Sequence, residues 1–332
     1  MDHDLVVDKN FNIYVVFGSK HPYGFVYAYL KYRSLLDSGG TSKHSIWSFR
    51  GVPLARVMER YSVGNVLDVM GFQSRIYDPV YDSVLPYLRY SEIYMHLLPE
   101  VRIREILERP RDDLELVVSE AVYMLRNASG VSLDYIGVGG SVLGGFHNVD
   151  LSDIDLVVYG CDNAVRVYHS IEGFAEPLKG SVLERWVRNQ AELHGVSMDL
   201  ARRMYAPYRR SLFRGRALTV VFPEPYSRYG DLYFRSYSSC CIARVEVPPN
   251  QCGALHYPGL VRVSGRVIPS GGCRFSGVDV DWLVLYEGAF SPIVFEGGPL
   301  EVRGVLARVY PGGGFAIIVG SRECGGNVFT FR

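Results

Sequence analysis

The sequence predicts an α+β protein made of three parts. Residues 111–230 alternate helical patterns with short strands around a glycine-rich turn, which is typical of a mixed sheet backed by helices. Residues 1–110 combine short apolar runs with a helical stretch, and we expect an N-terminal α/β region there. Residues 231–332 show short alternating runs separated by Gly and Pro, which predict a small all-β, barrel-like domain.

Length and composition exclude several classes of protein. The chain has 332 residues, 48% of them hydrophobic, with 35 basic and 35 acidic side chains. This is enough apolar material for two or three domains, and it excludes a disordered chain or a strongly basic nucleic-acid binder. No apolar run approaches the length of a membrane span, and the start lacks a basic export signal. We therefore expect a cytoplasmic protein without a membrane partner.

Two patterns define the first part and its junction with the second. Ile13–Phe17 follows a turn at Lys9-Asn10 and ends at Gly18, which predicts a strand. Residues 53–128 have a helical character, because Pro53 can occupy the first turn of a helix and residues 112–128 carry an apolar stripe that begins with acids. We expect helices over most of this stretch, up to Gly130.

The middle part is predicted strand by strand. A short strand at 135–138 leads directly into Gly139-Gly140-Ser141. After it we expect a strand at 153–159, helices at 163–172 and 181–193, and further strands at 196–200 and 217–222. An Arg-rich connection separates the last two strands. In the third part, runs at 242–247, 260–267, 282–286, 302–309 and 315–319 predict five strands, for which a barrel of the oligonucleotide-binding type is one analogy.

A pair of acids on the second strand is the strongest chemical signal. Asp153 and Asp155 are two residues apart, so a strand directs both carboxylates to one face, with Cα atoms roughly 6.6 Å apart. Ile154 and Leu156 then face the core. Two adjacent carboxylates repel each other unless a cation neutralises them, and Mg²⁺ is a hard ion that prefers oxygen ligands and also binds phosphate. We therefore predict a metal site with Asp153 and Asp155 as ligands.

The glycine turn predicts a phosphate site beside this pair. Gly139 and Gly140 permit a tight turn and a close approach of the backbone. Ser141 then lies near a helix N-terminus, where N–H groups and its hydroxyl can hold phosphate. As a third acid we add Asp199 on the strand expected at 196–200, where it can hold metal or act as a base. The alternative interpretation is that Asp199 is a surface acid paired with an arginine.

An Arg-rich stretch follows Asp199. Residues 202–216 contain six arginines, no acid and three interleaved aromatic side chains. Arginine suits bidentate contacts with phosphate and stacking on bases. The alternative is an ordinary solvated surface. We select Arg202, Arg209 and Arg210 as nucleotide-binding candidates.

These residues together resemble the DNA polymerase beta-like nucleotidyltransferase superfamily. The resemblance rests on Gly-Ser, then Asp-Ile-Asp, then a later Asp on a strand, and it covers about residues 131–225. A looser resemblance to a group of archaeal predicted nucleotidyltransferases spans most of the chain. It rests on His21-Pro22, on Ala28-Tyr29-Leu30-Lys31-Tyr32, on residues 152–160 and on Phe213-Arg214-Gly215-Arg216.

The resemblance implies a mixed sheet and two-metal nucleotidyl transfer. Asp153, Asp155 and Asp199 would hold Mg²⁺ (or Mn²⁺), and Gly140 and Ser141 would hold the triphosphate of an NTP. The acceptor would be a hydroxyl, and the Arg-rich stretch with the β-domain favours a nucleic acid, RNA first. Two alternatives stay open: transfer to a protein or small molecule, and a nucleotide- or nucleic-acid-binding module without catalysis.

The six cysteines leave a further question. Five of them lie in the last third of the chain, and no Cys-x-x-Cys pair occurs. Cys240, Cys252, His256 and Cys273 form one set that could hold zinc, although its spacing matches no common zinc module. A simpler interpretation is that the cysteines are buried free thiols. A third is that they form disulfides.

Overall fold

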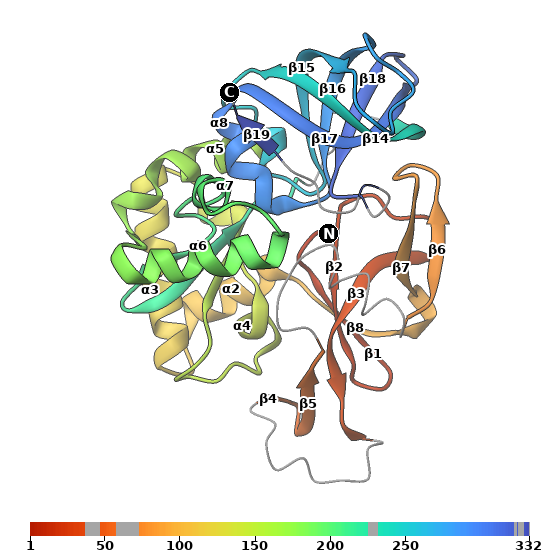
Figure 1. The fold of residues 1–332 in the computed structure, drawn as a ribbon. Coiled ribbons are helices and arrows are strands. Elements are labelled where there is room, and N and C mark those ends of the chain that lie inside the picture. The colour runs from red at the N-terminus through yellow and green to blue at the C-terminus, as the bar shows by residue number, and fades with distance from the viewer. Residues whose placement is uncertain (37–46, 58–72, 225–231, 322–323, 325–328, 332) are drawn as a thin grey trace.

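The computed structural model describes residues 1–36, 47–57, 73–224, 232–321, 324 and 329–331. Three sheets organise these residues, and most of the helices surround the middle one, so the α+β class is confirmed. Figure 1 shows the N-terminus at the centre, where the three sheets approach one another. Among the described residues, every helix is too short or too polar to cross a bilayer.

The first sheet has eight strands, and all of its recorded pairings are antiparallel. Its order is β4-β5-β3-β2-β1-β8, with β7 paired to β3 and β6 paired to β7. The strands are β1 (Leu5–Asp8), β2 (Ile13–Val16), β3 (Phe25–Ser34), β4 (Trp47–Phe49), β5 (Val52–Arg56), β6 (Arg75–Asp78), β7 (Ser83–Arg89) and β8 (Ile93–Leu97), and the 3-10 turn η3 (Tyr90–Glu92) precedes β8.

The strand predicted at residues 13–17 is confirmed, but the helical character expected from residue 53 onward is wrong for the described residues 53–57 and 73–97. Val52 and Leu54 are buried while their neighbours are partly exposed, which is the period of two that belongs to a strand. Pro53 lies in β5, where its missing N–H is tolerated beside the short edge strand β4. Residues 58–72 of the expected helical stretch lie outside the described part. In the described part of residues 1–110, the expected α/β region is a sheet followed by the helix Pro99–Glu108.

The second sheet has the order β11-β12-β13-β10-β9. β10 is parallel to β13 and antiparallel to β9, so the sheet is mixed. Its strands are β9 (Ile136–Val138), β10 (Ile154–Val158), β11 (Glu176–Pro177), β12 (Ser211–Phe213) and β13 (Arg216–Val221). Its helices are α2 (Pro99–Glu108), α3 (Asp113–Ser129), α4 (Gly140–Gly144), α5 (Cys161–Ser170), α6 (Gly180–His194) and α7 (Met198–Arg203), with 3-10 turns η4 (Leu133–Tyr135) and η5 (Ile171–Gly173).

Helix α3 shows how local sequence defines these elements. The Asp112 carboxylate accepts a hydrogen bond from the N–H of Glu115, which caps the first turn. Leu114, Val118 and Leu125 recur at helical spacing and are buried. Gly130 ends the helix in the left-handed conformation, with φ of 71°.

The third sheet closes into a barrel. β14 pairs with both β15 and β17, and β16 and β18 complete the ring, while β19 adds to β17. The five predicted strands are therefore confirmed. The elements are β14 (Tyr233–Val247), η6 (Cys252–Ala254), β15 (Gly259–Ile268), β16 (Asp279–Leu285), η7 (Gly288–Phe290), α8 (Ser291–Glu296), β17 (Gly298–Tyr310), β18 (Phe315–Val319) and β19 (Phe329–Phe331).

Continuous cores hold the three parts together. One cluster of buried apolar side chains extends from α3 and β10 through η7 and α8 into the barrel. Another connects the first sheet to the end of α4, where Phe146 packs against Tyr32 with ring centroids 5.0 Å apart. Because both clusters are buried and closely packed, they hold the three parts in fixed positions relative to one another.

Candidate functional site

A cavity of about 790 Å³ lies where the three parts meet. The first sheet and the chain before it contribute polar side chains, the second sheet contributes the glycine turn and the acid pair, and the barrel side contributes aromatic rings. The polar lining includes Asp2, His3, Lys31, Arg56, Gly139, Gly140, Asp153, Asp155, Arg210 and Thr219, and the rings include Tyr257 and Tyr286. This is large enough for a small-molecule ligand.

The glycine turn is built to lie against Asp155. Gly140 has φ of 60°, a conformation that favours glycine, and a Cβ added there would overlap Asp155 Oδ2. The N–H of Gly139 donates to the carbonyl of Asp155 at 2.8 Å. The expected strand-to-helix turn is therefore present, and α4 begins at Gly140. Only glycine permits this close approach of the turn to the carboxylate.

The acid pair lines the cavity as predicted. Asp155 lies on β10 and Asp153 immediately precedes that strand, and both contribute to the cavity wall. Ile154 and Leu156 are fully buried on the opposite side. The strand periodicity that predicted this division of faces is thus confirmed.

The electrostatic environment of Asp155 is mixed. Burial raises the pKa of its carboxyl group, and the neighbouring Asp153 raises it further. Lys31, Arg210 and His3 act in the opposite direction without cancelling the rise. Asp155 is therefore a partly buried acid that a divalent cation would stabilise in its charged form.

His3 brings a titratable base to the same place. Burial alone would lower the pKa of His3, but Asp2, whose Oδ2 lies 2.9 Å from His3 Nδ1, raises it and Asp155 adds to that effect. The net pKa of His3 is raised. A positive charge on His3 is thus favoured beside the acid pair.

Arg210 is the predicted arginine that reaches the acid pair. Its Nη1 donates to Asp153 Oδ2 at 2.8 Å, and both side chains are partly exposed to the cavity. An exposed pair of this kind contributes up to about 1 kcal/mol, so it can open when a stronger ligand arrives. Arg210 therefore neutralises Asp153 in this state of the protein.

The other predicted phosphate ligands are placed differently. Arg209 lines the cavity, but its partly buried guanidinium donates to the carbonyls of Ala289 and Met204, which ties this loop to η7. Arg202 is exposed and forms a bidentate ion pair with Glu184, away from the cavity lining. The structure thus brings Arg209 and Arg210 to the cavity and leaves Arg202 outside it.

Asp199 does not join the acid pair, and the strand expected at 196–200 is wrong. Residues 198–203 form α7, because Ser197 caps its first turn by accepting a hydrogen bond from the N–H of Leu200 at 3.2 Å. Asp199 lies in that first turn and is exposed. Its negative charge there interacts favourably with the positive end of the helix dipole. Asp199 is not among the residues lining the cavity. The sequence signal was the Ser two residues before an Asp, which is a helix-start pattern.

Thr219 lies beside Asp155 on the neighbouring strand. β13 pairs with β10 in parallel, and Asp155 is in register with Thr219. Side chains in register on adjacent strands share a face, so Thr219 lies beside Asp155 on the cavity wall. Its hydroxyl donates to the carbonyl of Arg209 at 3.4 Å.

Three basic side chains of the site come from the first part of the chain, and the sequence did not predict their place. They are His3, Lys31 and Arg56. Lys31 lies in the segment that carried the family resemblance, but no spacing rule relates β3 to β10. Only the packing of the first sheet against α4 brings them to the acid pair.

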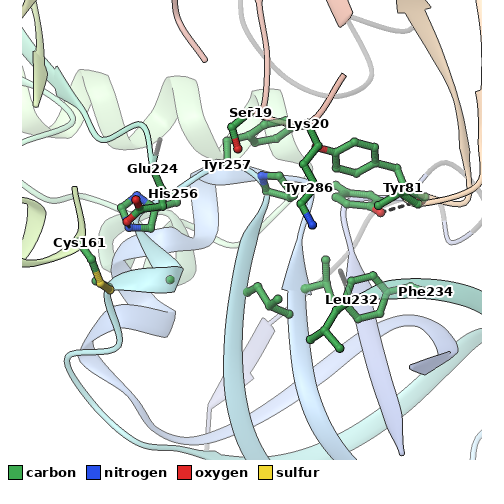
Figure 2. Close-up of a pocket in the computed structure, with 16 residues that line it drawn as sticks. Ser19, Lys20, Tyr81, Cys161, Glu224, Leu232, Phe234, His256, Tyr257 and Tyr286 are labelled. Carbon is green, nitrogen blue, oxygen red and sulfur yellow. Dashed lines mark hydrogen bonds and ion pairs between the residues drawn. A yellow bond between two sulfur atoms is a disulfide. The ribbon is translucent and has the colours of Figure 1, made fainter. Parts of the chain in front are cut away.

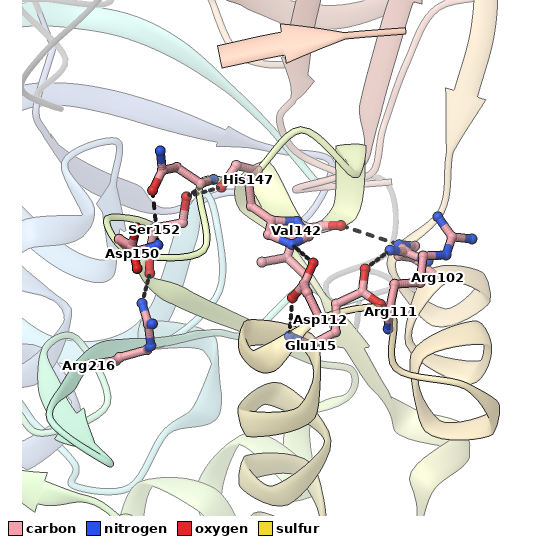
Figure 3. A network of polar contacts seen from close by, with 11 residues as sticks. Arg102, Arg111, Asp112, Glu115, Val142, His147, Asp150, Ser152 and Arg216 are labelled. Carbon is pink, nitrogen blue, oxygen red and sulfur yellow. Dashed lines mark hydrogen bonds and ion pairs between the residues drawn. The ribbon is translucent and has the colours of Figure 1, made fainter. Parts of the chain in front are cut away.

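A polar network holds the loop between α4 and β10 (Figure 3). Ser152 Oγ accepts hydrogen bonds from the N–H of Asn148 at 2.9 Å and from the hydroxyl of Ser141 at 3.2 Å. His147 Nε2 lies 2.8 Å from the Asp112 carboxylate, which also caps α3. Ser141 is therefore engaged in fixing the loop, and it is not among the residues lining the cavity.

The cysteine set considered from the sequence is divided by the fold. Cys273 forms a disulfide with Cys241, and Cys252 forms one with Cys161. Cys240 contacts Cys324 instead. The proposed zinc set of Cys240, Cys252, His256 and Cys273 is therefore wrong, because its members point to three different places.

Comparison of the chain with family models, curated proteins and solved structures gives no match.

Proposed function

We propose that this protein is a Mg²⁺-dependent nucleotidyltransferase that moves an NMP group from an NTP to an acceptor hydroxyl and releases pyrophosphate. The observation that supports it most is the convergence of the Gly139–Gly140 turn with Asp153 and Asp155 on one wall of the central cavity. This is the arrangement that the resemblance to the polymerase beta-like superfamily implies. The mixed sheet, with parallel β10 and β13, is compatible with that fold.

The donor set fits a magnesium ion. Asp153 and Asp155 offer carboxylate oxygens on one face, and hard oxygen ligands are what Mg²⁺ and Mn²⁺ prefer. Because Gly140 has no side chain, the backbone of the turn lies directly against the Asp155 carboxylate. When bound, the ion would neutralise the developing charge on the transferred phosphoryl group.

The chain's own residues account for the remaining requirements. Lys31, Arg56 and Arg210 supply positive charge for the triphosphate, and the backbone at Gly139–Gly140 can approach it closely. Arg210 can exchange its bond to Asp153 for one to a phosphate oxygen, since both bonds are charge-assisted. Asp153 is released for a cation by the same movement.

A nucleic acid, RNA first, is the acceptor that we favour. The barrel forms one side of the cavity and contributes the rings of Tyr257 and Tyr286, and the Arg-rich stretch contributes Arg210 to the same cavity. Positive charge beside aromatic rings is typical of surfaces that hold a strand of nucleic acid. A protein or small-molecule acceptor is tested in the same experiment.

Thr219 favours a second candidate function. With Thr219 beside Asp155 and Asp199 outside the cavity, neither β13 nor α7 adds a third carboxylate to the acid pair. Two carboxylates can hold one cation with a nucleotide while leaving the attacking hydroxyl without a metal ligand. The second candidate is therefore a module that binds nucleotide or nucleic acid without catalysis.

One assay separates these functions. The protein is incubated with each of four α-labelled NTPs, Mg²⁺ or Mn²⁺, and either RNA, protein or a small-molecule extract, and label transfer is measured. We expect transfer to RNA that Asp155→Asn lowers at least about 100-fold, because a neutral amide cannot replace the ligand. Asp199→Asn is the matched control and leaves transfer unchanged.

Each outcome decides between the candidates. Label on protein or on a small molecule keeps the chemistry and changes the acceptor. NTP binding without transfer to any acceptor supports the binding module. Transfer that survives Asp155→Asn, or disappears in Asp199→Asn alone, overturns the proposed site.

A further inference from the structure

Four potential metal ligands gather at a second, smaller cavity where the middle part meets the barrel. Cys161 begins α5, Cys252 begins η6, and His256 and Glu224 lie beside them (Figure 2). Ligand atoms of Cys161, Cys252 and His256 all lie within 4.8 Å of one another. All four residues line this cavity of about 90 Å³.

The orientation of His256 is the second observation. Its Nδ1 lies 2.6 Å from the carbonyl oxygen of Phe222, which can only accept, so Nδ1 carries the proton and donates it. Nε2 then faces Glu224 Oε2 at a distance of 3.7 Å. Histidines that ligate metals typically donate their other N–H to a carbonyl or carboxylate, which fixes the ring.

The separation of these two atoms fits a shared cation. Two ligands each about 2.0–2.1 Å from a tetrahedral zinc ion lie roughly 3.3 Å apart. The observed 3.7 Å exceeds a hydrogen bond and is close to that spacing. Two sulfur atoms, one imidazole nitrogen and one carboxylate oxygen make a complete tetrahedral zinc set.

We propose that, when Cys161 and Cys252 are reduced, these two cysteines bind a structural zinc ion together with His256 and Glu224. A dithiol reductant supplies two electrons to the Cys161–Cys252 disulfide, and each sulfur takes up one proton. The reductant becomes the disulfide. Zinc binding then releases the two thiol protons to solvent and leaves two thiolate ligands.

The proposed zinc site connects the same elements that the disulfide connects. Cys161 and Cys252 are 91 residues apart and belong to α5 and η6, which pack against each other. Either linkage therefore holds the barrel to the second sheet beside the central cavity. The protein keeps this connection in both an oxidising and a reducing environment.

Two other clusters among the described residues do not support the same inference. Cys241 and Cys273 form a disulfide without a third ligand atom grouped beside them. Asp112, Glu115 and His147 lie close together, but Asp112 caps α3 and Arg102 pairs with Glu115. These two carboxylates therefore already bind other groups of the protein.

The test uses the full chain, reduced with dithiothreitol and freed of the reductant without oxygen. Zinc is added, excess is removed, and bound metal is measured together with the affinity by chelator competition. We expect one zinc per chain, and a Co²⁺-loaded sample should show thiolate-to-cobalt absorption. Cys161→Ser and His256→Gln should each weaken binding at least about 100-fold, since even outer contacts cost 10- to 100-fold. Cys240→Ser is the matched control and retains the metal.

His256→Gln separates zinc binding from the disulfide. It leaves both cysteines in place, so the oxidised protein should still form the Cys161–Cys252 disulfide while the reduced protein loses zinc. The proposal is overturned if the reduced wild-type chain holds no zinc or if His256→Gln binds it as tightly as wild type. It also fails if Cys240→Ser loses the metal as Cys161→Ser does. No nucleotide is present, so the result is independent of transferase activity.

Discussion

Asp155 combines two properties that usually oppose each other in one residue. It is the proposed ligand of a cation, and it lies where burial raises its pKa. Gly140 gives up a side chain so that the backbone can approach it. A carboxyl group whose pKa is raised in this way lowers the stability of the metal-free protein when it is charged.

Removal of this charge should stabilise the metal-free protein. The pKa of Asp155 is higher in the folded state than its ordinary value, so the folded protein binds more protons above about pH 4. The contribution of Asp155 to the free energy of unfolding is therefore lost as the pH rises from its pKa in the unfolded chain through its higher pKa in the folded protein. We expect Asp155→Asn to raise the melting temperature at pH 7 but not at pH 3, as measured by calorimetry. An equal effect at both pH values, or a lower melting temperature at pH 7, would contradict the assignment.

Gly140 allows a matched test of the turn. Gly140→Ala and Gly145→Ala both place alanine at positive φ, which costs about 1–2 kcal/mol in each. Only the first also pushes a methyl group into the Asp155 carboxylate, because nothing lies within 4 Å of the added Cβ at Gly145. Gly140→Ala should therefore lose nucleotide and Mg²⁺ binding in titration calorimetry, while Gly145→Ala keeps both. Equal losses would mean that the turn acts only through stability.

At the scale of elements, adjacent strands place groups that the sequence separates by more than 60 residues. β10 carries Asp155, and parallel β13 carries Thr219 in register with it. α7 lies outside this register, which is why Asp199 is not part of the cavity. Strand pairing therefore determines which side chains lie beside Asp155.

Thr219→Asp should add the missing third carboxylate. The new side chain would share a face with Asp155, so we expect Mg²⁺ to bind several-fold more tightly, as measured by titration calorimetry. Thr219→Asn has the same shape without the charge and serves as the control. If Thr219→Asp leaves Mg²⁺ affinity unchanged, β13 does not face the metal.

The elements also show what could be predicted from the sequence. The turn at Gly139–Gly140 and the faces of β10 follow from local rules, because glycine conformation and strand alternation act within a few residues. The position of Asp199 was predicted wrongly because a short apolar run resembles a strand. In the structure the Ser197 hydroxyl caps the first turn of a helix instead. The strands between residues 75 and 97 gain their stability from distant partners such as β1 and β3, which no local pattern identifies.

At the scale of the whole molecule, three sheets surround the central cavity. Asp2 and His3 reach it from the chain terminus, and Figure 1 places that end at the centre of the protein. The first sheet therefore adds charge to a site whose acids lie on the second. The barrel closes the remaining side.

Lys31 tests whether the first sheet takes part in binding. Lys31→Met removes a positive charge that lowers the pKa of Asp155, and we expect NTP to bind about tenfold more weakly or worse. Lys9→Met is the control, because Lys9 is exposed in the turn between β1 and β2 and does not line the cavity. Fluorescence titration with a labelled NTP measures both. Equal affinities of the two variants would exclude a role for the first sheet.

The most direct test of the whole account is a crystal structure with Mn²⁺ and an NTP analogue that cannot be cleaved at the α-phosphate. Anomalous scattering locates the ion without assumptions about the ligands. We predict a manganese peak between the carboxylates of Asp153 and Asp155, with the triphosphate against Gly139 and Gly140 and Arg210 released from Asp153. Manganese bound elsewhere, or a nucleotide in the cavity with Arg210 still paired to Asp153 and no ion beside it, would contradict the account.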